Sequence, residues 1–289
     1  MILGRDWPEI YEIIASLRSP EDTKEGLVGA DVGRDEELDV ESLASSSQFQ
    51  EAQENDEELW ALQEANQGKQ DQQETSDSAK RSRSAAKSIL NGRTCRVVFD
   101  TFDRSVLRGG PVQGAYRLRQ LHFHWGSSDD HGSEHIIDGV KHAAELHMVH
   151  WNPKHGNFAG ALKQRDGVAV VGIFLQIGNT PKPEMKRILE EIDKIKTKGK
   201  EAPFHHFDPS ILFPKSRDYW TYEGSFTTPP CEECITWILL REPVVVSPDQ
   251  MAKLRSLSMN AENEPFCPLV DNWRPPQPLK GRVVRASFK

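Results

Sequence analysis

The sequence predicts an α/β fold in which strands dominate: a large, mostly antiparallel twisted sheet with peripheral helices, preceded by a largely disordered acidic segment. Three observations lead to this prediction. From about residue 84 onward, short runs with alternating or continuous apolar residues recur closely, which is typical of strands. Few stretches of that region show helical periodicity. Before residue 84, polar residues prevail, and large apolar ones are too few to offset chain entropy by burial.

Charge divides the chain into the same two parts. The 289 residues carry a formal net charge of −8. Residues 1–83 hold 21 acidic and 8 basic side chains, whereas residues 84–289 hold 23 acidic and 28 basic ones. We therefore expect an acidic, mostly disordered segment over residues 1–83, with a short helix over 6–17, and one folded domain over residues 84–289.

Composition narrows the location and the partners. No apolar run approaches the roughly 20 residues that span a bilayer, and the first residues lack the apolar core of a secretory signal. The basic cluster at 80–83 is too short to indicate nucleic-acid binding. We expect a cytoplasmic protein, a monomer, that acts on a small molecule and has no nucleic-acid or membrane partner.

The elements of the folded part follow from apolar periodicity and turn residues. Strands are predicted at 89–91 and 94–99 around a glycine turn, with a loop at 108–111. The β-branched run 168–177 predicts a strand buried on both faces. Helical spacing predicts helices at 183–196 and 247–256, and further strands are predicted at 219–222, 235–240 and 282–288.

Two strands carry a cluster of histidines. Residues 118–125 alternate polar and apolar with period two, so His122 and His124 project from one face. Residues 144–151 alternate in the same way and carry His147. If the two strands pair, three imidazoles converge. Three imidazole ligands with a fourth position left to water are typical of a catalytic zinc site.

A simpler interpretation competes with this one, because strand histidines are more often hydrogen-bonded core residues than ligands, and the chain has 10 His. The neighbouring residues favour the metal. Gln120 and Glu145 each lie two residues before a histidine on the same face, where they can accept the second N–H of a ligand. His150 points to the face opposite His147 and is interpreted as structural.

Four cysteines do not form a dense disulfide framework. Cys231 and Cys234 have the spacing of a redox pair or of half a zinc site. They follow two prolines and precede a strand, whereas a redox pair needs a helix N-terminus and a zinc ribbon needs a second pair. Reduced, mostly inert thiols are the favoured interpretation.

Six motifs in this order resemble the alpha-class carbonic anhydrases over about residues 84–289. They are Gln-Leu-His-Phe-His-Trp-Gly from Gln120, Glu134-His135, Ala-Glu-Leu-His-Met-Val-His-Trp-Asn from Ala144, Tyr-Trp-Thr-Tyr from Tyr219, Gly-Ser-Phe-Thr-Thr-Pro-Pro from Gly224, and Asn-Trp-Arg-Pro-Pro from Asn272. Within that family, Arg93, Arg96, Arg119 and Phe226 are most similar to a cytosolic, muscle-type form.

The resemblance implies a Zn²⁺ lyase that converts CO2 and water reversibly to bicarbonate and a proton. Its ligands would be His122, His124 and His147, and zinc would bring the pKa of bound water to about 7, a value established for this same family. Gln120, Glu145 and the backbone carbonyl of Asn272 would orient the three ligands in turn.

The resemblance also implies roles for residues around the metal. Thr227 is expected to accept a hydrogen bond from the attacking hydroxide and to donate one to Glu134. Thr228 would help to hold bicarbonate. The apolar pocket for CO2 would be lined by Val149, Val170, Phe226 and Trp237, which without a metal would pass for ordinary core residues.

Two residues predict slow turnover. Fast members of the family export the proton through a histidine, and the matching position here is Arg93, which stays protonated and cannot relay a proton. Phe226, beside Thr227, would crowd the solvent side of the pocket. The charges of Arg93, Arg96 and Arg119 should lower the pKa of the metal-bound water.

The N-terminal part departs from the family. Relatives begin with some fifty residues that contribute an aromatic cluster and part of the sheet edge, and no matching pattern occurs in residues 1–83. The alternative function is therefore a catalytically impaired, carbonic anhydrase-like protein that binds zinc or mediates interactions.

Overall fold

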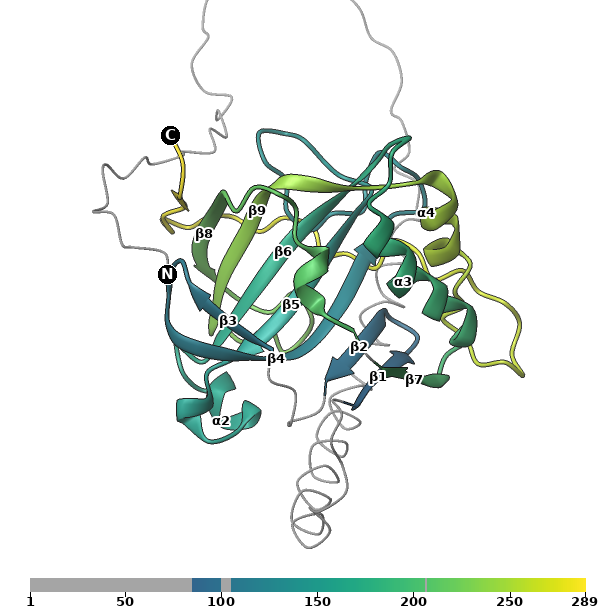
Figure 1. Ribbon diagram of the computed structural model, residues 1–289, viewed down its shortest axis with the longest axis horizontal. Helices are drawn as coiled ribbons and strands as arrows, with labels where there is room; N and C mark the ends of the chain where they lie inside the picture. Colours follow the sequence, from purple (N-terminus) through teal and green to yellow (C-terminus); the bar gives the residue numbers. More distant parts are fainter. Residues whose placement is uncertain (1–84, 100–104, 206) are drawn as a thin grey trace, which may run out of the picture. The chain divides into compact units, whose positions relative to one another are not determined.

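The computed structural model describes residues 85–99, 105–205 and 207–289 (Figure 1). The expected helix at 6–17 and the rest of the acidic segment lie outside these residues. Within them, the prediction of a strand-dominated fold with a large, mostly antiparallel sheet and few helices is confirmed.

In the described part of the chain, ten strands form one sheet in the order β10-β8-β9-β6-β5-β4-β2-β1-β7, with β3 paired to β4. Every pairing is antiparallel except that of β6 with β9. The strands are β1 (Ala85–Leu90), β2 (Cys95–Phe99), β3 (Val106–Gly109), β4 (Val112–Trp125), β5 (Ala144–Trp151), β6 (Val168–Ile177), β7 (Glu201–His205), β8 (Tyr219–Gly224), β9 (Ile235–Val246) and β10 (Arg285–Ala286).

The two faces of the central strands carry different residues, because side chains alternate across a sheet. One face builds the main hydrophobic core, to which β4 contributes Leu121, Phe123 and Trp125, all fully buried. The opposite face of the same strand carries His122 and His124. The sheet thus separates a purely apolar layer from a layer that holds the polar candidate residues.

Helices close the apolar layer. The α-helices of the described residues are α2 (Phe158–Leu162), α3 (Pro183–Glu191) and α4 (Pro248–Arg255), and short 3-10 turns include η3 (Ile192–Lys194). Met185 and Ile188 of α3 and Leu254 of α4 belong to the same core as the strands. Ser247 caps α4 in a capping box with Gln250, which satisfies exposed N–H groups at its start. No helix among the described residues is both long and apolar enough to cross a bilayer.

Several predicted boundaries differ from the observed ones. Strands β5 and β6 have the predicted bounds, whereas β9 continues past the predicted end at residue 240 to Val246. The predicted loop at 108–111 overlaps the end of β3, and the strand predicted at 282–288 is reduced to Arg285–Ala286. Strand β7 was not predicted, because its five residues alternate weakly and include a proline.

Candidate metal centre

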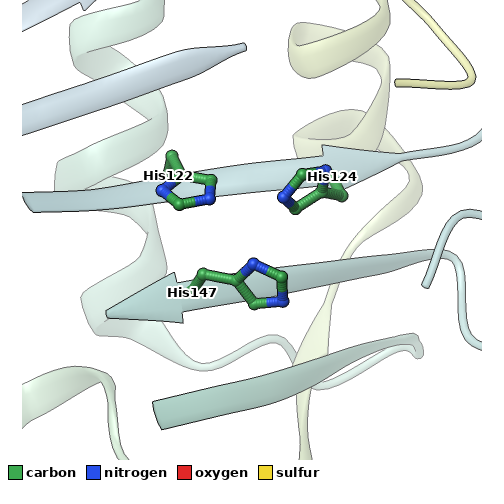
Figure 2. A group of neighbouring side chains, drawn as sticks. All are labelled: His122, His124 and His147. Carbon is green, nitrogen blue, oxygen red and sulfur yellow. The ribbon is translucent and has the colours of Figure 1, made fainter. Parts of the chain in front are cut away.

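Three histidines meet on the polar face of the central strands (Figure 2). His122 lies opposite His147 in the pairing of β4 with β5, and His124 is two residues further along β4. The ring centroids are 4.6 to 5.2 Å apart. One nitrogen from each ring lies within 4.8 Å of the other two, so a single ion can contact all three.

His124 has its ring orientation fixed from one side. Its Nδ1 lies 2.7 Å from the backbone carbonyl oxygen of Asn272, compared with 3.3 Å from Glu134 Oε1. Since a carbonyl only accepts, Nδ1 carries the proton and Nε2 keeps its lone pair. Nε2 is buried and has no hydrogen-bond partner. A buried acceptor without a partner costs free energy, and a metal ion on Nε2 removes that cost.

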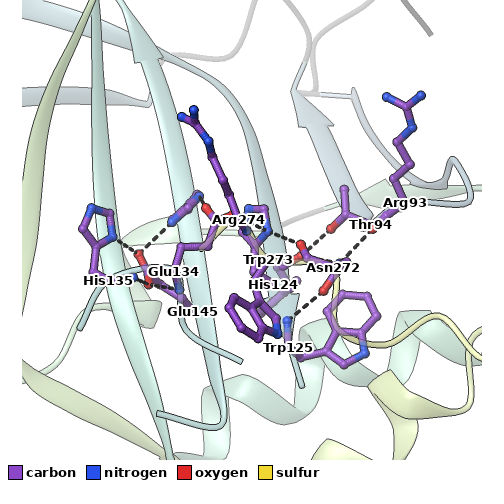
Figure 3. Close-up of polar contacts among 12 residues, drawn as sticks. Arg93, Thr94, His124, Trp125, Glu134, His135, Glu145, Asn272, Trp273 and Arg274 are labelled. Atoms are coloured by element: carbon purple, nitrogen blue, oxygen red, sulfur yellow. Dashed lines mark hydrogen bonds and ion pairs between the residues drawn. The ribbon is translucent and has the colours of Figure 1, made fainter. Parts of the chain in front are cut away.

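His147 is held by a carboxylate in the same way. Its Nε2 lies 2.8 Å from Glu145 Oε1, which leaves the lone pair of Nδ1 available to a metal ion. Glu145 is fully buried and also accepts from the His135 ring at 2.6 Å and from the backbone N–H groups of Glu134 and His135 at 2.9 Å. Figure 3 shows Glu145 with its partners Glu134 and His135. Burial raises the pKa of Glu145, but the charge of His135 and the hydrogen bonds from the His135 and His147 rings outweigh burial and hold it well below its usual range.

The three ring pKa values favour metal binding. Burial is the main cause that lowers the pKa of His122, His124 and His147 below the usual value. The other two rings and Arg96, which lies opposite His122 in β2, lower the pKa of His122 further. Neutral imidazole is the form that binds zinc, so the environment prepares all three rings for a metal.

Gln120 occupies the expected face but not the expected hydrogen bond. It is largely buried in β4, two residues before His122. Among the described residues, no hydrogen bond joins its side chain to His122. The β4–β5 register shifts between Leu118 and Gln120, and this irregularity lies beside the Gln120 side chain.

Glu134 lies beside the ligands with one oxygen held and one unpartnered. Its Oε1 accepts from the backbone N–H of Arg274 at 2.7 Å, and its buried Oε2 has no hydrogen-bond partner at normal distance. Burial raises the pKa of Glu134, whereas hydrogen bonds from the Arg274 N–H and the Thr227 side chain act to lower it. Thr227 is half-buried, and the following Thr228 is exposed.

Apolar side chains adjoin the histidines on neighbouring strands. Val149 of β5 pairs with Val170 of β6, which in turn pairs with Trp237 of β9. All three are at least 98% buried, and the Trp237 ring centroid is 4.7 Å from that of His147. They lie on the polar-residue face rather than in the main core, and therefore form an apolar wall beside the three histidines. Phe226 is half-buried in the segment before Thr227.

Arg93 lies two residues before the start of β2 and contributes to the site through its backbone. Its carbonyl oxygen accepts from Asn272 Nδ2 at 2.8 Å, while its guanidinium extends away from Asn272 (Figure 3). Asn272 Oδ1 accepts from the backbone N–H of Trp125 at 2.9 Å. Asn272 thus links β4 to the segment before β2.

Sequence reasoning gave no role to His135, Tyr222 or the backbone of Arg274. His135 bridges Glu145 and the Tyr222 hydroxyl, the latter at 2.6 Å. The adjacent Glu134-His135 pair was the available signal, but no spacing rule connects it to β5 or β8.

The three histidines and their burial define a class of protein: an enzyme with a three-histidine metal centre set on the face of a large β-sheet. Comparison with known proteins gives the family. The family model of the eukaryotic-type carbonic anhydrases matches residues 61–288. The match starts within residues 1–83, the segment in which sequence analysis found no family pattern. The chain therefore belongs to the carbonic anhydrase family, whose enzymes use zinc to hydrate CO2.

Curated relatives agree with this assignment. The chain is 75% identical over 207 residues to carbonic anhydrase 3 of Rattus norvegicus, 74% to that of Mus musculus and 72% to that of Homo sapiens. Each alignment covers 71% of this chain and 79% of the relative. The similarity to carbonic anhydrase 3 matches the resemblance expected from the arginines and Phe226.

Proposed function

We propose that this chain catalyses the reversible hydration of CO2 to bicarbonate and a proton, with zinc held by His122, His124 and His147. The observation that carries the proposal is the buried, unpartnered Nε2 of His124, which lies within reach of ligand atoms of the other two rings. Zinc held there would lower the pKa of a bound water to about 7, as is established for carbonic anhydrases, and would so supply hydroxide at neutral pH.

Glu134 and Thr227 orient the attack. The Arg274 N–H donates to one carboxylate oxygen of Glu134, and the other oxygen, Oε2, is free to accept a hydrogen bond from the Thr227 hydroxyl. Once the only hydroxyl hydrogen of Thr227 is used in this bond, the hydroxyl oxygen can act only as an acceptor. It then selects a hydroxide whose O–H points toward it, which leaves a lone pair directed at CO2.

The apolar wall of Val149, Val170 and Trp237 supplies a place for CO2, which has no dipole and gains little from polar contacts. Phe226 narrows the same space, and Thr228 is assigned to the bicarbonate product. The wall also keeps water out of the space beside the reacting carbon, so that water does not compete with CO2 for this space.

Turnover is limited by export of the proton. Arg93 occupies the position of a proton relay but cannot release a proton at working pH. Arg96 lies opposite His122 and already lowers the pKa of that ring. By the same electrostatics, Arg93, Arg96 and Arg119 disfavour the more cationic state of the site and lower the pKa of water there. The hydroxide form is thus favoured, while its regeneration stays slow.

The cytoplasm is the proposed compartment and a monomer the proposed state. All four cysteines are unpaired thiols, which fits a reducing environment. The boundary between residues 83 and 84 also stays a prediction, and the family match from residue 61 favours an earlier start of the domain.

A stopped-flow CO2 hydration assay on the zinc-loaded protein, with and without an aryl sulfonamide, tests the function. We expect hydration above the buffer rate that the sulfonamide and zinc removal both abolish. Hydration at the buffer rate by fully zinc-loaded protein would contradict the proposal and favour the zinc-binding interaction protein instead.

A further inference from the structure

Outside the metal centre, one histidine lies between two carboxylates. His131 Nε2 is 2.8 Å from Asp271 Oδ1, and His131 Nδ1 is 2.6 Å from Asp130 Oδ1. A ring that donates from both nitrogens is the imidazolium form. The loop around His131 is tightly packed, since a Cβ atom on Gly126 would lie 2.2 Å from the His131 carbonyl oxygen. The position of His131 is therefore set by the backbone.

Asp271 is anchored from several directions. Besides His131, its Oδ1 accepts from the backbone N–H of Ser127 at 2.9 Å and from Trp273 Nε1 at 3.4 Å. Its own N–H donates to the Trp125 carbonyl oxygen at 2.9 Å, and its φ of 55° is a left-handed conformation that such contacts must maintain. These bonds fix Asp271 at the end of β4.

The residues that follow Asp271 contribute two backbone groups to the metal centre. The Asn272 carbonyl oxygen accepts from His124 Nδ1, and the Arg274 N–H donates to Glu134 Oε1, each at 2.7 Å. The positions of such backbone groups depend on whatever anchors the segment. Figure 3 shows both groups converging on the site from this one short segment.

We propose that the His131–Asp271 pair is a positioning device for the metal centre. The pair fixes the segment 271–274, and the segment in turn holds the proton and orientation of His124 and the carboxylate of Glu134. His131 and Asp271 are positioning residues, because they act on the ligand only through Asn272. The inference rests on the proposed function in taking His124 as a metal ligand.

The rate at which the full-length, zinc-loaded protein releases zinc to an excess of a coloured chelator tests this. His131→Ala and Asp271→Asn should each accelerate release about three- to tenfold, somewhat less than the 10- to 100-fold effect of a group that directly supports a ligand. His131→Gln keeps a side-chain N–H that can reach Asp271, so it should restore most of the wild-type rate.

His155→Ala is the matched control. His155 Nε2 lies 3.0 Å from Asp166 Oδ1, and its side chain is 16% exposed, compared with 26% for His131. This variant also removes a surface His–Asp pair and should lower the unfolding temperature about as much as His131→Ala. Its zinc release rate should stay within twofold of wild type.

A second readout reports geometry directly. In the cobalt-loaded protein, His131→Ala should change the visible absorption bands of the metal, and His155→Ala should leave them unchanged. Wild-type release rates in both His131→Ala and Asp271→Asn would overturn the inference, as would equal acceleration in His155→Ala. If those variants behave like wild type while wild type binds zinc and hydrates CO2, only this inference fails. If wild type binds no zinc, the proposed function fails with it.

Discussion

His122 lies directly opposite His147 in the antiparallel pairing of β4 with β5. This pairing places histidines from two strands on a common face. His124 completes the set, because it is the next residue of β4 on that same face. A register slip of one residue would turn one strand's histidines to the other face. The arrangement of the three histidines therefore depends on the register of the β4–β5 pairing.

Substitution of Gly172 should lower both the stability of the fold and its affinity for zinc. Gly172 of β6 pairs with His147, and a Cβ atom there would lie 2.6 Å from Leu239 Cδ2 and 3.2 Å from Glu145 Oε1. We expect Gly172→Ala to destabilise the fold by about 1–3 kcal/mol, as overpacking does, and to weaken zinc binding by displacing Glu145. Denaturant unfolding and chelator competition measure the two effects.

Gly178→Ala is the control for that prediction. Its Cβ atom would lie 2.7 Å from Val245 Cγ1, a similar clash away from the metal centre. It should destabilise the fold comparably and leave zinc affinity unchanged. Equal losses of zinc affinity in both variants would refute a local role for Gly172.

Removal of the Glu145 charge should weaken zinc binding. Glu145→Gln keeps the shape of the side chain but gives the His147 and His135 rings a weaker acceptor. We expect zinc affinity to fall about 10- to 100-fold, measured by competition with a chelator. Asp166→Asn, which alters the surface carboxylate beside His155, should leave affinity unchanged; a similar loss there would argue against a specific role for Glu145.

Proton export should respond to an added relay. We expect imidazole buffer to raise the steady-state hydration rate, and Arg93→His to raise kcat about tenfold or more by supplying a group that titrates near neutrality. Arg93→Gln removes the charge without adding a relay, so its kcat should rise less. If imidazole left the rate unchanged, proton export would not be the limiting step.

Burial of His150 should make stability depend on pH. Burial is the main cause that lowers its pKa to about 4, and its Nδ1 has no hydrogen-bond partner. Between pH 6.5 and about 4 the unfolded chain binds a proton at this ring that the folded protein does not, so stability falls as pH falls. At pH 5 the loss from this group is about 2 kcal/mol relative to pH 7.5.

His150→Leu checks that figure. Its unfolding free energy should fall less between pH 7.5 and 5 than that of wild type, by about 2 kcal/mol, since the other titrating groups are shared. Parallel pH profiles for the two proteins would contradict the assignment.

Alternation of residue type was enough to predict that the three histidines lie together. The apolar and polar alternation of β5 and the β-branched run of β6 gave both strands their observed bounds, and the same period put His122 and His124 on one face. These are local patterns in long, regular strands. Strands β3 and β7 were not predicted, because these short segments show little periodicity and contain a glycine and a proline, respectively.

Support from distant parts of the chain could not be read from local patterns. Asn272 lies 148 residues from the ring it orients and acts through a backbone carbonyl, which leaves no trace in its side chain. Only the family resemblance suggested that contact. The expected bond from Gln120 to His122 is missing among the described residues, since sharing a strand face does not fix a rotamer.

X-ray absorption at the zinc edge of the zinc-loaded protein measures which atoms hold the metal. We expect one zinc per chain with three nitrogen ligands at about 2.0–2.1 Å and one light oxygen ligand. A sulfur ligand at about 2.3 Å, or zinc that remains bound with the same spectrum in His124→Ala, would contradict it.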